Sequence, residues 1–128
     1  MPKKILIIDD DIDLVEAMRL TLETAGFEVI DAQDGSKGLE MARSQHPDLI
    51  LLDVMMGTQD EGFHVAYQMR QDDALKNIPI IMLTAVGQET GFTFNKEKDE
   101  DFLPVDEFLE KPVDPQKLIE TIKVNLGM

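Results

Sequence analysis

The strongest constraint on the fold is an alternation between short apolar runs and segments with helical periodicity. The apolar runs predict strands over residues 3–8, 27–32, 48–54, 78–84 and, more briefly, 107–110. Helix-period segments lie between or after them, over residues 12–25, 34–45, 60–73 and 115–126. Strands that are apolar throughout occur in parallel sheets covered by helices on both faces. The pattern therefore predicts one α/β domain spanning residues 1–128.

Each predicted helix carries an apolar stripe that should face the sheet. The stripes are Val15, Met18, Leu22 and Ala25, closed by Gly26; then Phe63, Ala66 and Met69; and finally Leu118, Ile119, Ile122 and Leu126, with Asp114 as the N-cap. Right-handed crossovers favour the flavodoxin-like, doubly wound strand order 2-1-3-4-5. In that order a crevice opens beyond the carboxyl ends of strands 1 and 3, where the winding reverses.

Residues 87–106 interrupt the regular pattern. The alternation requires a fourth helix here, but Gly87, Gly91 and Pro104 break the segment and no helical stripe persists. We therefore expect helix 4 to be replaced by a loop, or shortened to a turn near residues 96–101.

Composition and charge exclude several classes of protein. The formal net charge is −14 and no Lys/Arg patch stands out, so direct nucleic-acid binding is not expected. No apolar stretch is long enough for a signal-peptide core or a membrane span. The chain has no cysteine, which is compatible with a reducing cytoplasm and excludes thiol chemistry. We expect a cytoplasmic protein without membrane contact.

Charged and polar residues gather where the predicted strands end. Strand 1 runs into Asp9, Asp10 and Asp11, strand 3 into Asp53, strand 4 into Thr84 and strand 5 into Lys111. Because the carboxyl ends of parallel strands meet at one edge, these groups should converge there. Carboxylates that lie so close together repel one another, and a hard divalent cation such as Mg²⁺ would remove this repulsion.

The same set of groups suits phosphoryl transfer. A carboxylate can act as the nucleophile and form an aspartyl phosphate, and Asp53 is the candidate. Lys111 offers a mobile positive charge to a phosphoryl oxygen, and Thr84 offers a hydroxyl donor. Taken singly, each residue has an ordinary structural explanation. Asp11 is better explained as a helix N-cap, Asp53 could be a turn residue, Thr84 a strand former and Lys111 a solvated charge. His46 and His64 are expected at the surface.

Four stretches, KILIIDDD, DLILLDVMM, IPIIMLTA and EFLEKPVD, resemble the motifs of response-regulator receiver domains of two-component signal transduction. The resemblance covers essentially the whole chain and implies a chemotaxis-regulator-like fold. It implies that Asp53 is the phosphoacceptor and that Mg²⁺ is held by Asp9, Asp10, Asp53 and the carbonyl of Met55. By the same resemblance, Thr84 and Lys111 contact the phosphoryl group, Thr84 and Phe108 act as switch residues, and the Lys111–Pro112 bond is cis.

The resemblance also implies partners. The phosphoryl group would come from a sensor histidine kinase or a histidine phosphotransfer protein, and the change would be relayed to a downstream protein in a phosphorelay. The chain would be a self-catalysed phosphoacceptor and not a turnover enzyme, either standing alone or cut from a longer protein. The sequence departs from the family at Gly57, where a proline is usual, at Phe108, where Tyr is more frequent, and in the long segment before strand 5.

Two alternatives remain open at this stage. One is a haloacid-dehalogenase-type phosphatase with Asp9 or Asp11 as its nucleophile, although the chain is short for a body and a cap. The other is a receiver-like binding module that takes no phosphate, which predicts gaps among the site residues. Turnover of a phosphate ester would identify the first, and failure to be phosphorylated would identify the second.

Overall fold

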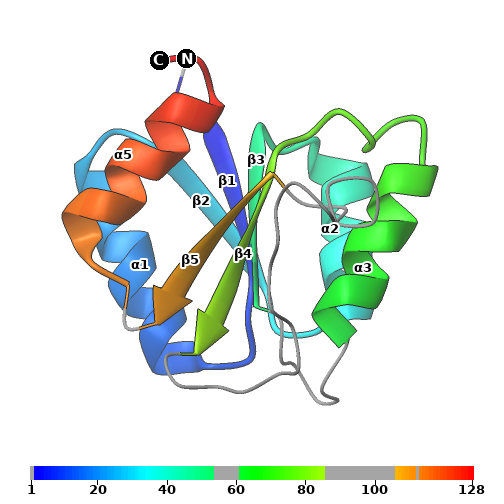
Figure 1. The fold of residues 1–128 in the computed structure, drawn as a ribbon, viewed down its shortest axis with the longest axis horizontal. Helices are drawn as coiled ribbons and strands as arrows, with labels where there is room; N and C mark the ends of the chain where they lie inside the picture. Colours follow the sequence, from blue (N-terminus) through cyan, green and yellow to red (C-terminus); the bar gives the residue numbers. More distant parts are fainter. Residues whose placement is uncertain (1, 54–60, 86–105, 112) are drawn as a thin grey trace, which may run out of the picture.

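The computed structural model describes residues 2–53, 61–85, 106–111 and 113–128, and its centre is a parallel sheet (Figure 1). The strands are β1 (Lys4–Ile8), β2 (Glu28–Ala32), β3 (Leu49–Asp53), β4 (Ile80–Ala85) and β5 (Glu107–Lys111). They form one five-stranded sheet in the order β2-β1-β3-β4-β5, and every neighbouring pair is parallel. The predicted flavodoxin-like order is confirmed.

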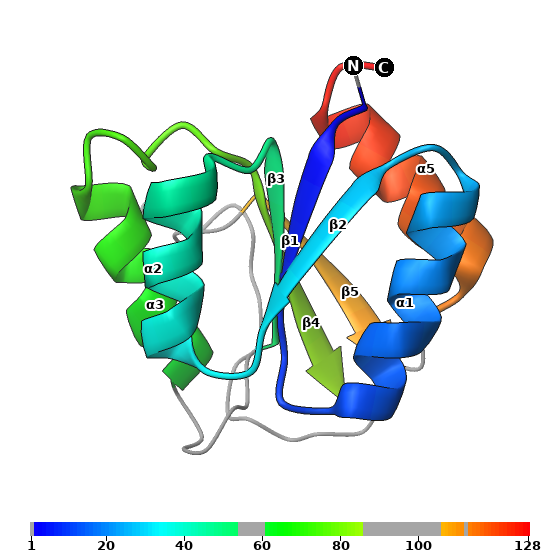
Figure 2. The same ribbon diagram turned by 180° about the vertical axis from the view of Figure 1, so that it is seen from behind.

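Helices cover both faces of this sheet, as Figures 1 and 2 show. One face carries α1 (Ile12–Thr24) and α5 (Pro115–Asn125), and the other carries α2 (Gly35–Gln45) and α3 (Glu61–Gln71). The loop or shortened helix predicted over residues 87–106 lies outside the described residues except for Asp106, and Met55, Gly57 and Pro112 also lie outside them.

Each face of the sheet has its own apolar core, because successive side chains of a strand point to opposite faces. On the α1/α5 face, alternate strand residues pack with the helices: Ile5, Ile7, Leu49, Leu51, Ile81, Leu83 and Leu109. On the α2/α3 face the intervening residues do the same: Leu6, Ile8, Ile50, Leu52, Ile80 and Met82. The central strands are therefore apolar throughout, as their sequences indicated.

Three aspartates cap helices at the edge of the sheet where the strands end. Asp11 accepts from the Leu14 amide at 3.2 Å, Asp34 from the Lys37 amide at 2.8 Å and Asp114 from the Lys117 amide at 3.0 Å. Such caps satisfy amides that the first helical turn leaves without partners. The N-cap role predicted for Asp11 and Asp114 is confirmed, and Asp34 lies before α2 instead of inside it.

Element boundaries differ from the sequence prediction in a few places. The apolar stripe of α1 ends at Leu22, and Ala25 is an exposed C-cap instead of an inward-facing residue. Gly26 follows with φ 97°, a conformation that costs glycine little. α3 ends at Gln71 instead of residue 73, and β4 begins at Ile80, because a turn over residues 72–77 separates them. His46 and His64 are exposed, as predicted.

Close packing between α2 and β1 depends on Gly38. A Cβ built at Gly38 would lie 2.5 Å from Cδ1 and 2.9 Å from Cγ1 of Ile8. The absence of a side chain therefore lets α2 approach the end of β1, directly before Asp9. Among the described helices, none combines the length and apolar character needed to cross a membrane.

Candidate functional site

Three carboxylates meet at the carboxyl edge of the central strands. Asp9 and Asp10 follow β1, and Asp53 is the last residue of β3. One carboxylate oxygen from each lies within 4.8 Å of the others. Asp9 is fully buried and Asp53 is 5% exposed, whereas Asp10 is exposed. The predicted acidic cluster is therefore present, with two of its members inside the protein and one at its mouth.

Strand alternation explains why Asp9, Asp53 and Lys111 meet. Asp9 continues the series Ile5 and Ile7, Asp53 continues Leu49 and Leu51, and Lys111 continues Leu109. All of those apolar residues face α1 and α5, so the next residue in each series is directed to the same side. The parallel register then brings the three strand ends together, since Asp53 pairs with Leu83 and Lys111 with Ala85.

Lys111 supplies the positive charge of the site. Its Nζ lies 3.0 Å from Oδ2 of Asp9 and 3.3 Å from Oδ1 of Asp53, and its side chain is 20% exposed. Burial acts to lower the pKa of the Lys111 ammonium, but the attraction of Asp53 and then of Asp9 outweighs it, so the pKa is raised. Lys111 therefore stays protonated and offsets part of the charge of the cluster.

The two oxygens of Asp9 have different surroundings. Oδ1 accepts the Asp11 amide at 2.9 Å, which fixes the carboxylate on the turn into α1. Oδ2 is buried and faces Lys111 as an ion-pair partner, without a well-directed hydrogen bond. A buried carboxylate oxygen with spare acceptor capacity, beside two further carboxylates, is suited to a hard cation.

Thr84 and Phe108 lie on the face of the sheet opposite to the one that Asp9, Asp53 and Lys111 share. Met82 pairs with Phe108 on the neighbouring strand, and Thr84 is two residues after Met82, so all three are on the same face. Thr84 also directly follows Leu83, the strand partner of Asp53. The alternation directs Thr84 and Phe108 toward the α2/α3 side, where Phe108 packs against the core. Both predicted switch residues therefore share one face, with Thr84 at the site edge.

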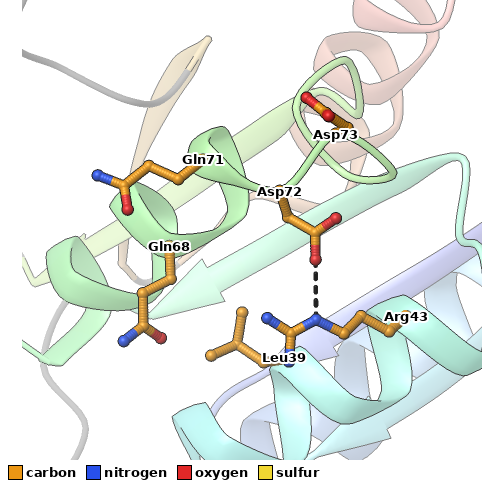
Figure 3. A pocket seen from close by; sticks show the side chains of 6 residues that line it. All are labelled: Leu39, Arg43, Gln68, Gln71, Asp72 and Asp73. Atoms are coloured by element: carbon orange, nitrogen blue, oxygen red, sulfur yellow. Dashed lines mark hydrogen bonds and ion pairs between the residues drawn. The ribbon is translucent and has the colours of Figure 1, made fainter.

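A separate groove lies between α2 and α3, and Figure 3 shows its lining. This open groove of about 720 Å³ is lined by Leu39 and Arg43 on α2, by Gln68 and Gln71 on α3, and by Asp72 and Asp73 in the turn after α3. Nε of Arg43 donates to Oδ2 of Asp72 at 2.8 Å across it (Figure 3). The hydrogen bond from Arg43, and to a smaller extent the one from the Ala74 amide, lower the pKa of Asp72. The last turn of α3 lies away from the strand ends that carry the acidic cluster, so the groove is not part of that site.

Comparison with known proteins agrees with this fold and site. The family model of the response regulator receiver domain matches residues 5–123. The chain belongs to the response regulator receiver domain family, whose members are signalling domains of two-component systems.

Individual relatives are similar over nearly the whole chain. The alkaline phosphatase synthesis transcriptional regulatory protein PhoP of Bacillus subtilis is 37% identical over 98% of this chain, but only 49% of PhoP is covered. The polar-differentiation response regulator DivK of Brucella anthropi is 32% identical, with 99% of this chain and 98% of DivK covered. The chain therefore spans about half of some relatives and nearly all of others.

Solved structures show the same fold. The chemotaxis response regulator CheY4 of Vibrio cholerae has a TM-score of 0.82 at 30% identity, covering 98% of this chain and 99% of CheY4. A CheY-like receiver domain protein from Methanospirillum hungatei has a TM-score of 0.81 at 26% identity, covering 99% of this chain and 95% of that protein.

Proposed function

We propose that Asp53 accepts a phosphoryl group from a phosphohistidine on a sensor histidine kinase or a histidine phosphotransfer protein. One observation carries the proposal: Asp53, at the end of β3, shares a cluster with Asp9 and Asp10 while Lys111 reaches its Oδ1 at 3.3 Å. The chain is then a phosphorylation-dependent switch whose state a downstream protein reads.

In the proposed transfer, an oxygen of Asp53 attacks phosphorus in line with the leaving imidazole nitrogen. The new bond is O–P, the P–N bond breaks, and its electron pair stays on the histidine nitrogen. In this proposal Lys111 moves from Asp53 to the incoming phosphoryl oxygens, and the hydroxyl of Thr84, near the carboxyl end of β4, donates to them.

Asp9, Asp10 and Asp53 are the described residues that would hold Mg²⁺, and the carbonyl of Met55 is a further proposed ligand. A bound Mg²⁺ supplies charge that neutralises the phosphoryl oxygens. The buried Oδ2 of Asp9 supports this assignment, because one ammonium shared with Asp53 leaves that oxygen with acceptor capacity for a second cation.

The phosphatase alternative is less well supported. Asp11, one of its two candidate nucleophiles, uses its carboxylate to cap α1. Asp9, the other candidate, is fully buried and already binds the Asp11 amide and Lys111. Family membership also favours a signalling domain over a turnover enzyme.

The test is to incubate the protein with acetyl phosphate and Mg²⁺ and to follow a base-labile phosphate on the intact chain. Asp53→Asn should abolish labelling while the circular dichroism spectrum stays native. Asp73→Asn is the matched control, because Asp73 is an exposed aspartate in the distant groove. Full labelling of Asp53→Asn would refute the assignment of the phosphoacceptor, and an unlabelled parent would favour a binding module.

A further inference from the structure

Hydrogen bonds around Arg70 and Asp106 connect α3 with Ile80, the first residue of β4, and with the residue directly before β5. Nη2 of Arg70 donates to Oδ2 of Asp106 at 2.7 Å, and the same oxygen accepts the Ile80 amide at 2.9 Å. The Asp106 amide donates back to the Ile80 carbonyl at 2.8 Å. We call this set of contacts between Arg70, Asp106 and Ile80 the β5 latch.

Arg70 is also held by the backbone next to the latch. Its Nη1 donates to the carbonyl of Lys76 at 2.9 Å and to that of Ile78 at 2.8 Å. An isolated ion pair at a partly exposed position contributes little to stability. A guanidinium that donates hydrogen bonds to several acceptors at once, however, is held in one position. Arg70 therefore fixes Asp106 relative to the residues that lead into β4.

The latch adds a fixed point at the start of β5, in addition to the packing of Leu109 and Phe108 on opposite faces of the sheet. β5 is an edge strand of the sheet, and Leu109 is the one side chain of this strand that is buried. Residues 86–106 connect it to β4, and a connection of that length does not dictate register as a tight hairpin does. Two hydrogen bonds join Asp106 to Ile80, one residue before the first ladder pair, Ile81 and Glu107. They therefore align the start of β5 with the start of β4.

The register of β5 decides where Lys111 stands. A slip of one residue would turn the Lys111 side chain to the α2/α3 face, and a slip of two would move its backbone by about 6.6 Å along β4. The first change would direct the ammonium away from Asp53, and the second is about twice the present 3.3 Å between Lys111 Nζ and Asp53 Oδ1. The latch and the acidic cluster thus hold opposite ends of the same short strand.

We propose that Arg70 and Asp106 are positioning residues that set the register of β5 on β4 and thereby hold Lys111 within reach of Asp53. The consequence for phosphoryl transfer rests on the function proposed above, whereas the consequence for β5 does not. Arg70 and Asp106 act through Lys111 and take no part in the chemistry themselves.

The test compares Arg70→Gln and Asp106→Ala with Arg43→Gln. Arg43 is the matched control, because it makes the same kind of bond to Asp72 at 2.8 Å without touching β5. Native-state amide exchange is measured in β5 and β3, and NMR contacts between Met82 and Phe108 report the register. Both latch variants should exchange β5 amides about tenfold faster than the parent, with β3 amides and the Arg43→Gln protein little changed.

A conservative variant separates register from gross instability. Asp106→Asn keeps an oxygen for the Ile80 amide but loses the charge that pairs with Arg70, so β5 exchange should fall between the parent and Asp106→Ala. Initial phosphorylation rates with acetyl phosphate and saturating Mg²⁺ should decrease several-fold in the same order. If β5 amides exchanged at the same rate in Arg70→Gln and Arg43→Gln, and the Met82–Phe108 contacts stayed intact, the proposal that the latch sets the register of β5 would be wrong.

A loosened β5 with an unchanged phosphorylation rate would overturn the role assigned to Arg70 and Asp106 in placing Lys111. The exchange and contact measurements decide the register whether or not the parent is labelled. A parent that takes no phosphoryl group overturns the proposed function instead, so the two failures are distinguishable.

Discussion

The ammonium of Lys111 lies 3.0 Å from Oδ2 of Asp9, so the last residue of edge strand β5 is tied to the residue that follows β1. The same ammonium lies 3.3 Å from Oδ1 of Asp53. One cation from the edge of the sheet therefore compensates two buried carboxylates at its centre, and this sharing has measurable consequences.

Removing the Lys111 charge should destabilise the metal-free protein. Lys111→Met leaves Asp9 and Asp53 without their shared counter-charge, and we expect a loss of about 1–3 kcal/mol in the free energy of unfolding, allowing for partial exposure of the lysine. The measurement is urea unfolding in EDTA at neutral pH. Lys117→Met is the control, because Lys117 is exposed on α5, and it should change the free energy of unfolding little.

The pH dependence of that loss follows from the raised pKa of Lys111. A raised pKa means that the folded state holds the proton more tightly, so the stabilisation is complete below the ordinary value of 10.5. It disappears as pH rises through the higher folded value. The difference in unfolding free energy between the parent and Lys111→Met should therefore shrink above about pH 10.5. A difference that grows with pH there would contradict the pairing.

Neutralising Asp10 should stabilise the metal-free protein and weaken its response to Mg²⁺. Asp10 adds a third negative charge to Asp9 and Asp53, but it is exposed, so the gain in Asp10→Asn should be below about 1 kcal/mol. Mg²⁺ should raise the melting temperature of the parent by mass action and raise that of Asp10→Asn less.

Asp13→Asn is the control for the Mg²⁺ experiment. Asp13 is an exposed aspartate in the first turn of α1 and lies outside the cluster. Its variant should keep the Mg²⁺ shift of the parent. Equal shifts in the parent and Asp10→Asn would show that Asp10 is not a ligand.

Gly38→Ala should destabilise the fold where α2 meets β1. The new Cβ would stand 2.5 Å from Cδ1 of Ile8, and Cγ1 and Cγ2 are at 2.9 and 3.0 Å, so rotation of one methyl group cannot relieve the overlap. We expect a net loss of about 1–2 kcal/mol by thermal or urea unfolding, after the better helix propensity of alanine is counted.

A double-mutant cycle checks this explanation. Ile8→Val removes Cδ1, the nearest atom, so it should recover part of the loss when combined with Gly38→Ala. Ser36→Ala, at an exposed position of the same helix, should have a small effect. Strict additivity of Ile8→Val and Gly38→Ala would contradict a direct clash.

His46→Gly should stabilise the protein. His46 is the C-cap of α2 and adopts φ 50° and ψ 63°, a left-handed conformation that costs a residue with a Cβ more than glycine. We expect a gain of about 0.5–1 kcal/mol in the free energy of unfolding. His46→Ala removes the imidazole without relieving the backbone, so a gain as large in His46→Ala would assign the effect to the side chain.

Much of the fold could be predicted because it follows from local patterns. Apolar runs such as that of β3 indicate a strand buried on both faces, and Asp11 and Asp114 mark helix starts by short-range capping. The convergence of Asp9, Asp10 and Asp53 followed from the parallel order of the strands.

Details that depend on contacts between distant elements could not be predicted. Asp9 and Asp10 are neighbours of identical chemistry, yet one is fully buried and the other exposed. Ala25 continues the helical stripe of α1 in sequence but is exposed, because the helix ends before it. Arg70 and Asp106 carry no motif, and only the meeting of α3 with the start of β5 pairs them.

The sequence by itself thus determined which segments become strands and helices, their order, and the residues that reach one edge of the sheet. The tertiary structure decided which of those residues lose contact with water and which share a counter-charge. Periodicity and capping act over a few neighbouring residues, whereas burial and ion pairing depend on how β1, β3 and β5 pack together across the chain.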